Sequence, residues 1–363
     1  MTLTIHPIYQ IFPLGGDQAQ VWEAFQTEVN NEKSWKTNQP DLEMTVDPQS
    51  CCKTAGKVAL IVAKICILPW GICSGIKFCI NKFALRQVYP AQRRFSQKEL
   101  NLWRTAILHD QNQGGRILRH LRLKRDGESY SAFLISSVET IANGQWALHA
   151  GGNKAAIEHE CGRKPSYADA YLKEGFNVLF VNGPGVGLSS TMDSIQQLGN
   201  AQELGLCFLE SAIKAQRIVL TGVSIGSGAL SLAINRHTFL QDREYLVLRF
   251  ATFGRLSDAI KIASGKCGQF LLSKLGCEID SVSASRKLDH LGIPEIIYQN
   301  EDDRQMKNAA LNAELAFALQ QEGPFQHKAF KVIAGAAHHH LSYDQVSTEL
   351  QLWQHRGNEA EAV

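Results

Sequence analysis

A short corner containing a serine and two glycines, set between two apolar segments, limits the folds open to this chain more than any other feature. Residues 217–234 read RIVLTGVSIGSGALSLAI. The apolar run before Gly222 suits a buried strand, and the run after Gly226 suits a helix. At such a corner the G-x-S-x-G sequence places Ser224 in a strained backbone conformation, and the glycines leave room for the close approach of strand and helix. The pattern predicts a serine hydroxyl held at the start of a helix.

Strand-like apolar runs recur along residues 117–355, separated by segments of helical periodicity. The first run, HLRLKRDGESYSAFLISS, is a predicted hairpin around Asp126 and Gly127. The later runs are QWALHAGGN, NVLFVNGPGVG, RIVLTGVSIG, YLVLRFATFG, PEIIYQNEDD and AFKVIAGAAHHH. Helices are predicted in LGNAQELGLCFLESAIK and NAALNAELAFALQQ. This alternation predicts an α/β fold with a mostly parallel, doubly wound sheet, which binds ligands beyond the carboxyl ends of its strands.

Acidic residues and histidines follow the last two predicted strands. The acidic triplet occupies 301–303, after PEIIYQN, and the histidine triplet occupies 338–340, after AFKVIAGAA. A serine hydroxyl becomes a nucleophile when a base takes its proton, and an acid must hold that base in the right tautomer. The chain therefore offers a nucleophile, an acid and a base in that order, each at the end of a strand.

The turns around these strands resemble those of the α/β-hydrolase superfamily over residues 117–355. VNGPGVGLSS is similar to the family's D-x-P-G-x-G-x-S turn, with Asn182 where aspartate is usual. QNEDDR is similar to the G-x-x-D turn, with Asn300 in the glycine place, and IAGAAHHH is similar to the histidine turn. LHAGGN lies where the family has its His-Gly oxyanion loop, with Ala150 replacing the first glycine. The resemblance implies an α/β-hydrolase fold.

The resemblance also implies roles for particular residues. Ser224 aligns with the nucleophile, Asp303 with the acid and His338 with the base. The backbone N–H groups of Ile225 and of the turn at Gly151 and Gly152 would hold the oxyanion. No cofactor is implied.

Several neighbouring residues compete for these roles. His339 is the alternative base and Asp302 the alternative acid, while Glu301 and Asp258 are further acids that a solvated turn would explain. His340 is assigned to packing or solvent. A metal site at the histidine triplet is not expected, because no H-E-x-x-H or carboxylate spacing accompanies it.

Two polar residues near these turns are given structural roles. His149 is expected to hold the oxyanion loop, and Asn182 is expected to be a turn residue rather than a catalytic group. The glycines at 183, 185 and 187 match a dinucleotide-binding loop poorly, because the final spacing is missing.

A hydrophobic and basic helical region, residues 51–100, precedes the predicted hydrolase domain, and residues 1–50 form an N-terminal extension. Nine basic residues and no acidic residue lie between Pro48 and Lys98, although the formal charge of the whole chain is only +2. Residues 58–80, VALIVAKICILPWGICSGIKFCI, approach the roughly 20 residues that cross a bilayer. Three interpretations stay open: a membrane span, an interfacial helix on anionic lipid, and a helix buried against the hydrolase domain.

Charge and cysteine content bear on location and partners. If residues 58–80 span a bilayer, the basic residues after them place the C-terminal domain in the cytoplasm. The nine cysteines form no C-x-x-C pair, which argues against a disulfide framework and a zinc site and favours a reducing compartment. The first residues lack the features of a cleavable signal peptide. The near-neutral charge gives no argument for nucleic acid as a partner.

More loosely, the hydrophobic, basic N-terminal part joined to such a core resembles membrane-associated proteins of chlamydiae and related intracellular bacteria.

Two further segments carry predictions. Residues 255–291 include an amphipathic stretch that is either a short lid over the site or an ordinary crossover helix. Residues 356–363 are expected to be a frayed tail.

The sequence therefore predicts a membrane-associated serine hydrolase that cleaves a carboxylic ester or thioester with an apolar, lipid-like chain. Two alternatives stay open. One is an inactive hydrolase fold that binds membranes or partners, and the other is an acyltransferase with the same three catalytic residues.

Overall fold

The computed structural model describes residue 89 and residues 116–125, 127–152, 156–158, 166–306, 309–311, 313, 326–335, 338 and 343–361. The predicted membrane segment, residues 58–80, and the predicted extension, residues 1–50, lie outside the described residues. No helix of the described part is both long enough and apolar enough to cross a membrane.

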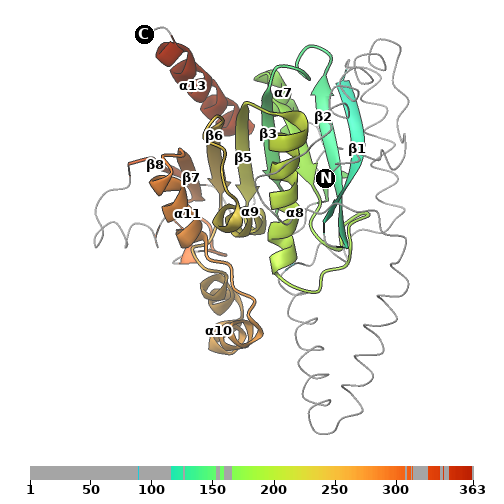
Figure 1. The fold of residues 1–363 in the computed structure, drawn as a ribbon. Coiled ribbons are helices and arrows are strands. Elements are labelled where there is room, and N and C mark those ends of the chain that lie inside the picture. The colour runs from blue at the N-terminus through green and yellow to red at the C-terminus, as the bar shows by residue number, and fades with distance from the viewer. Residues whose placement is uncertain are drawn as a thin grey trace.

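Strands and helices alternate along the described chain (Figure 1). The strands are β1 (Arg116–Arg125), β2 (Glu128–Ser137), β3 (Gln145–Ala150), β4 (Asn177–Val181), β5 (Arg217–Val223), β6 (Glu244–Phe250), β7 (Glu295–Asn300) and β8 (Lys328–Ile333). The helices are α7 (Tyr167–Lys173), α8 (Gln196–Cys207), the π-helix η1 (Phe208–Ile213), α9 (Ile225–Arg236), α10 (Leu256–Leu275), α11 (Ser281–His290) and α13 (Tyr343–Glu361). Each strand expected from the sequence is present.

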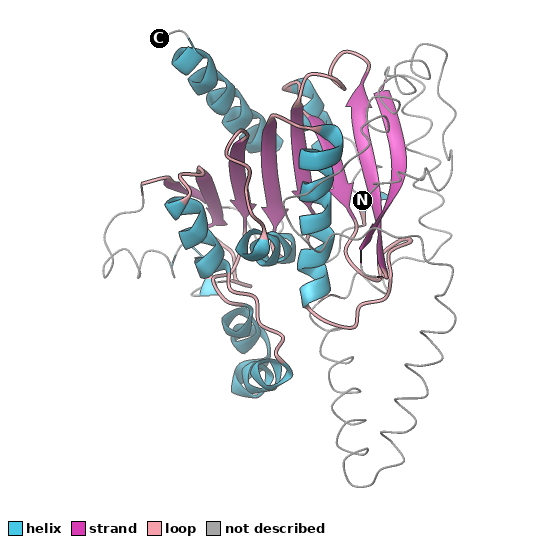
Figure 2. Cartoon of the chain, in the orientation of Figure 1, coloured by secondary structure: helices cyan, strands magenta, loops and turns pink. Residues whose placement is uncertain are grey.

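The strands form one sheet in the order β1-β2-β4-β3-β5-β6-β7-β8 (Figure 2). Strands β1 and β2 are antiparallel to each other, and β2 is antiparallel to β4. All pairs from β4 to β8 are parallel. The prediction of a mostly parallel α/β sheet is therefore confirmed. The carboxyl ends of β5, β7 and β8 face the same edge of the sheet, and that edge carries the candidate site.

Helices cover both faces of the sheet (Figure 1). Leu204 of α8, Leu230 of α9 and Leu288 of α11 share one buried cluster with Leu220 of β5. On the other face, α7 and α13 pack against a second cluster that includes Val219 of the same strand. Because both faces are buried, the central strands read as continuous apolar runs rather than as alternating ones.

The predicted hairpin at the start of the sheet has the expected turn. Arg125 of β1 pairs with Glu128 of β2, so two residues connect the strands. Gly127 has φ 77°, a conformation that glycine adopts without the steric penalty other residues meet.

The helix expected around residues 198–214 changes character partway along. It begins as α8 and continues as η1, and Lys214 ends it with φ 58° in the left-handed region. The predicted helix NAALNAELAFALQQ lies mostly outside the described residues.

Residues 255–291 contain both α10 and α11 (Figure 1). Helix α11 packs against α9, as a crossover helix does. Helix α10 is kinked at Gly265, where the backbone has φ 71° and ψ −173°. The role of α10 as a lid stays a prediction.

The C-terminal helix α13 continues to Glu361, so it includes most of residues 356–363, which the sequence analysis assigned to a frayed tail. Val346 and Leu350 anchor the start of α13 in the core, and Trp353 packs partly buried against the same cluster.

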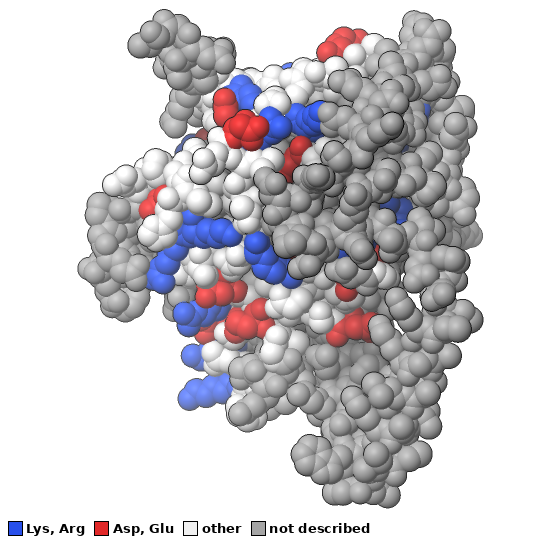
Figure 3. Space-filling model, in the orientation of Figure 1, with Lys and Arg blue, Asp and Glu red and all other residues white. Residues whose placement is uncertain are grey.

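The described surface carries charges of both signs. On the face shown in Figure 3, Lys and Arg side chains lie among Asp and Glu side chains.

Candidate active site

Ser224 lies at the corner between β5 and α9, as the sequence pattern predicts. Its backbone has φ 53° and ψ −120°, a region that residues with a side chain rarely occupy. The Ser224 N–H donates a hydrogen bond of 2.9 Å to the Phe250 carbonyl at the end of β6. The strained conformation is therefore held by the neighbouring strand as well as by the helix that follows.

The two glycines of the corner are required by close packing. A Cβ atom on Gly222 would lie 2.6 Å from Cα of Ser227, inside the first turn of α9. A Cβ atom on Gly226 would overlap the carbonyl oxygens of Ala150 and Gly151. Gly226 thus brings the start of α9 directly against the loop after β3.

His338 is the described member of the histidine triplet 338–340, and it lies beside Ser224. Its Nε2 is 3.0 Å from Ser224 Oγ, and its Nδ1 is 2.8 Å from Oδ2 of Asp303. Asp303 follows β7 and His338 follows β8, so three strand ends bring the three side chains together. His338 and Asp303 are both buried, and the arrangement is a continuous hydrogen-bonded chain from hydroxyl to imidazole to carboxylate.

The Asp303 carboxylate is well supplied with donors. Oδ1 accepts hydrogen bonds of 3.0 Å from the backbone N–H groups of Gln305 and Met306. Oδ2 accepts one of 2.9 Å from Nε2 of Gln299, in addition to the contact with His338. Burial alone would raise the pKa of Asp303, but the His338 contact and the backbone donors outweigh it and hold that pKa below its usual range.

The competing acids point elsewhere. Asp302 is exposed, and Glu301, also exposed, accepts a hydrogen bond from the backbone N–H of Gly335. Asp258 accepts from Gln269 within α10. His339 and His340 lie outside the described residues, so His339 as alternative base stays a prediction.

The predicted oxyanion residues meet beside the corner. Ile225 is the first residue of α9, and the first N–H groups of a helix have no carbonyl partner within it. Ile225 and Gly151 both line a small cavity of about 30 Å³, room for one or two water molecules. Gly152 lies outside that lining, near Val223.

The same cavity is lined mainly by apolar residues, with a few polar ones among them. Its described lining includes Tyr89, His149, Asn182 and Gln202, whereas the Ser224 and His338 side chains are not part of it. The candidate active site is therefore identified by the hydrogen-bonded chain and not by this cavity. The cavity contacts only two of the predicted oxyanion residues, Ile225 and Gly151.

His149 is buried in a position that fits its expected structural role. Its ring stacks on Tyr167 at 4.5 Å between centroids, and its Nδ1 lies 3.1 Å from the hydroxyl of Tyr171. These contacts fix the end of β3, from which Ala150 and Gly151 lead into the oxyanion loop.

Asn182 is hydrogen-bonded to a buried carboxylate, that of Glu158, which was not among the residues predicted from the sequence. Its Oδ1 accepts a hydrogen bond of 3.1 Å from the Ile157 N–H, and its Nδ2 donates one of 3.1 Å to the fully buried Glu158. An aspartate here, as in the family pattern, would set two carboxylates against each other. Glu158 is separated from Asn182 by 24 residues, so no local motif reveals the pair.

Within the described residues, no group of His, Cys, Asp and Glu side chains could hold a metal ion. Cys207 and Cys277 are both buried, and neither forms a disulfide.

Comparisons with known proteins address the fold. A family model described as Chlamydia CHLPS protein (DUF818) matches residues 121–345, more than half of the chain. An alpha-beta hydrolase from Vibrio vulnificus aligns with a TM-score of 0.54 and 15% sequence identity, covering 79% of this chain and 94% of that one. An esterase from Pyrococcus furiosus aligns with a TM-score of 0.47 and 15% identity, covering 69% of this chain and 91% of that one. No curated protein matches the chain. The Vibrio likeness shows that the fold is that of the α/β hydrolases.

Proposed function

The chain belongs to the family described as Chlamydia CHLPS protein (DUF818) and has the α/β-hydrolase fold, and from this premise we propose that it is a serine hydrolase. The observation that carries the proposal is the hydrogen-bonded chain from Ser224 through His338 to Asp303. Serine hydrolases on unrelated folds use the same three groups in the same relation.

In the proposed reaction, Ser224 Oγ attacks the carbonyl carbon of a carboxylic ester or thioester while its proton passes to Nε2 of His338. The N–H groups of Ile225 and of the Gly151 turn stabilise the negative charge on the carbonyl oxygen. His338 then returns the proton to the leaving group, which departs and leaves an acyl-enzyme. A water molecule, deprotonated by His338, attacks the acyl carbon. As the second tetrahedral intermediate collapses, the bond to Ser224 Oγ breaks and His338 returns the proton to that oxygen, which releases the acid and regenerates free Ser224.

Asp303 has a separate part in this scheme. Its carboxylate accepts a hydrogen bond from the Nδ1–H group of His338, and this tautomer leaves Nε2 able to take the proton of Ser224. Because its pKa is held below the usual aspartate range, Asp303 is ionised at neutral pH and also stabilises the imidazolium that forms during each proton transfer.

We further propose that the substrate has an apolar, lipid-like acyl chain and that residues 58–80 hold the protein at a membrane. The sequence supports this through the length and basic flanks of that segment. The hydrolase domain is proposed to face a reducing compartment, and the absence of a disulfide at Cys207 and Cys277 agrees with this proposal.

Covalent labelling of the full-length protein with a fluorophosphonate tests the proposal. We expect one labelled site, and peptide mapping by mass spectrometry is expected to find it at Ser224. A panel of p-nitrophenyl esters from acetyl to palmitoyl then measures chain-length preference. A folded protein that is neither labelled nor active on any ester contradicts the proposal and favours a non-catalytic binding protein. Acyl transfer to added alcohols or lysolipids in preference to water identifies an acyltransferase.

Replacing Gly226 by alanine is expected to slow the labelling of Ser224 by about 10²-fold, the cost of a misplacement on the order of 1 Å in a catalytic site. The new methyl group overlaps the carbonyl oxygens of Ala150 and Gly151, so the loop or the helix start must move. The rate of labelling measures the effect.

Gly175→Ala is the control, because it adds a methyl group to a glycine in the turn before β4, at the opposite edge of the sheet from Ser224, with no atom within 4 Å of it. It is expected to label within about 3-fold of the wild type, since the backbone strain at its φ of 77° lies away from the corner at Ser224. Equal slowing in both variants would contradict the importance of the contact between α9 and the loop.

A further inference from the structure

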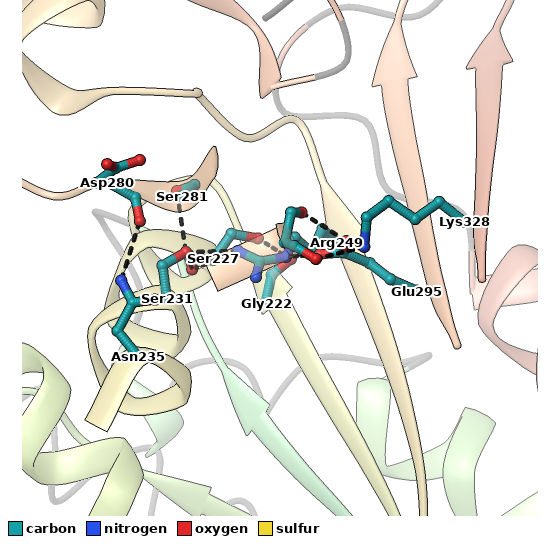
Figure 4. A network of polar contacts seen from close by, with 10 residues as sticks. Gly222, Ser227, Ser231, Asn235, Arg249, Asp280, Ser281, Glu295 and Lys328 are labelled. Carbon is teal, nitrogen blue, oxygen red and sulfur yellow. Dashed lines mark hydrogen bonds and ion pairs between the residues drawn. The ribbon is translucent and has the colours of Figure 1, made fainter. Parts of the chain in front are cut away.

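Three charged side chains lie together inside the protein, beside the helix that follows Ser224 (Figure 4). Arg249 of β6 donates from Nε to Oε1 of Glu295 at 2.5 Å, and Lys328 of β8 donates from Nζ to Oε2 of the same carboxylate at 2.9 Å. Glu295 begins β7, between the other two strands. All three side chains are fully buried.

Burying these three charged groups in the core carries a large desolvation cost. Arg249 projects from the same face of β6 as Tyr245 and Val247, which belong to the main hydrophobic cluster. Two cations share one carboxylate, so the cluster carries one positive charge. Burial alone would raise the pKa of Glu295, but the adjacent Arg249 and Lys328 hold it below its usual range. Buried ion pairs generally add little stability compared with apolar residues of similar size, so the cluster calls for another explanation.

Arg249 also bonds to α9. Its Nη1 donates to the Ser227 carbonyl at 3.2 Å and to Ser231 Oγ at 2.5 Å. The Ser227 hydroxyl in turn donates to the Gly222 carbonyl at 2.7 Å, and this bond joins the first turn of α9 to the end of β5. Ser231 also contacts Ser281 of α11 at 2.9 Å between hydroxyl oxygens. The planar fork of a guanidinium holds its donors in fixed directions, here toward a carboxylate on one side and a helix on the other, whereas an ammonium is a compact charge without that fixed geometry.

We propose that Arg249 is a positioning residue that fixes the first turn of α9 relative to the sheet, and with it Ser224 and the Ile225 N–H. Glu295 orients the guanidinium, and Lys328 balances the far side of Glu295. Arg249 acts through Ser227 and Ser231. The inference rests on the proposed function of Ser224, because the geometry it maintains is that of the nucleophile and the oxyanion donor.

The experiment compares two substitutions that make the same change of charge. Arg249→Met and Lys328→Met each leave one cation paired with Glu295, so neither strands a buried charge. Only the first removes the bonds to α9 recorded above. Arg249→Lys is the second test variant, because it keeps the charge but loses the fork. Each full-length variant is examined by thermal melting, by the fluorophosphonate labelling rate and ester kinetics, and by amide hydrogen exchange in peptides covering residues 225–236.

We expect Arg249→Met to reduce the labelling rate and kcat by about 10²-fold with little change in KM, and to speed hydrogen exchange in α9. Arg249→Lys is expected to behave in the same way. Lys328→Met is expected to stay within about 3-fold of the wild type in rate, with exchange in α9 unchanged, because it leaves the contacts of Arg249 in place.

Other outcomes overturn the proposal. Equal slowing in Arg249→Met and Lys328→Met would show that charge or general stability matters, and a wild-type labelling rate in Arg249→Met would show that the tether is dispensable. Unfolding of both Arg249 variants while Lys328→Met folds would assign the residue to folding instead. If the wild type is not labelled, the proposed function of Ser224 fails, but hydrogen exchange still tests the positioning role of Arg249. Faster exchange in α9 of Arg249→Met alone supports that role, and equal exchange in Arg249→Met and Lys328→Met refutes it.

Discussion

Replacing Ser224 by alanine is expected to lower kcat/KM by about 10⁶-fold, the effect typical of removing the nucleophile of a serine hydrolase. Fluorophosphonate labelling is expected to disappear, because Ser224 supplies the hydroxyl that lies 3.0 Å from His338 Nε2. The fold is expected to survive, since alanine faces the same backbone strain at φ 53° as serine does and adds no new overlap. Ester hydrolysis and thermal melting, measured on the same preparation, check both expectations.

Ser283→Ala is the matched control for this experiment. Ser283 has an exposed side chain on α11, away from the corner. Activity in this variant is expected to equal that of the wild type. Retention of more than about 10⁻² of the activity in Ser224→Ala would point to a nucleophile other than Ser224 and would contradict the proposed mechanism.

Replacing His338 by alanine is expected to lower kcat/KM by about the same 10⁶-fold, because serine and histidine act as a unit and either loss removes most of the rate enhancement. The double variant with Ser224→Ala should therefore be little worse than either single one. His339→Ala is the control that separates the two candidate bases. A large loss in His339→Ala with activity retained in His338→Ala would reassign the base.

The role of Asp303 as the acid is tested by comparing it with its neighbour Asp302. Asp303→Asn is expected to cost about 10⁴-fold in kcat, because an amide favours the wrong imidazole tautomer. The exposed Asp302→Asn should cost nothing measurable. Because the pKa of Asp303 is lowered on folding, its contribution to stability is present above the ordinary aspartate pKa of about 4. It is lost as the pH falls through the folded-state value, so the stability difference between wild type and Asp303→Asn should shrink on acidification.

The parts of the fold that could be predicted were those encoded locally. The corner at Ser224 could be predicted because its glycines, its serine and the two apolar runs are adjacent in the chain. The strands of the sheet could be recognised because their burial on both faces produces unbroken apolar runs. Asp303 and His338 could be proposed as partners because each stands just after such a run.

Features that depend on distant neighbours could not be predicted. Arg249 near the end of the run YLVLRF gives no local sign that it is buried, and its partner Glu295 lies 46 residues away. Asn182 could be recognised as unusual, but its reason, Glu158, lies in a segment with no motif. The π-helix η1 could not be distinguished from α8, since the apolar spacing of a helix continues through both.

The hydrogen bond from the Ser224 N–H to the Phe250 carbonyl has a consequence for biosynthesis. The strained corner gains this support only after β6 has emerged from the ribosome and aligned beside β5. The imidazole arrives later still, 114 residues after the serine. A nascent chain released before residue 338 therefore contains the hydroxyl without its proposed proton acceptor, so the proposed acyl chemistry at Ser224 requires synthesis to reach at least residue 338.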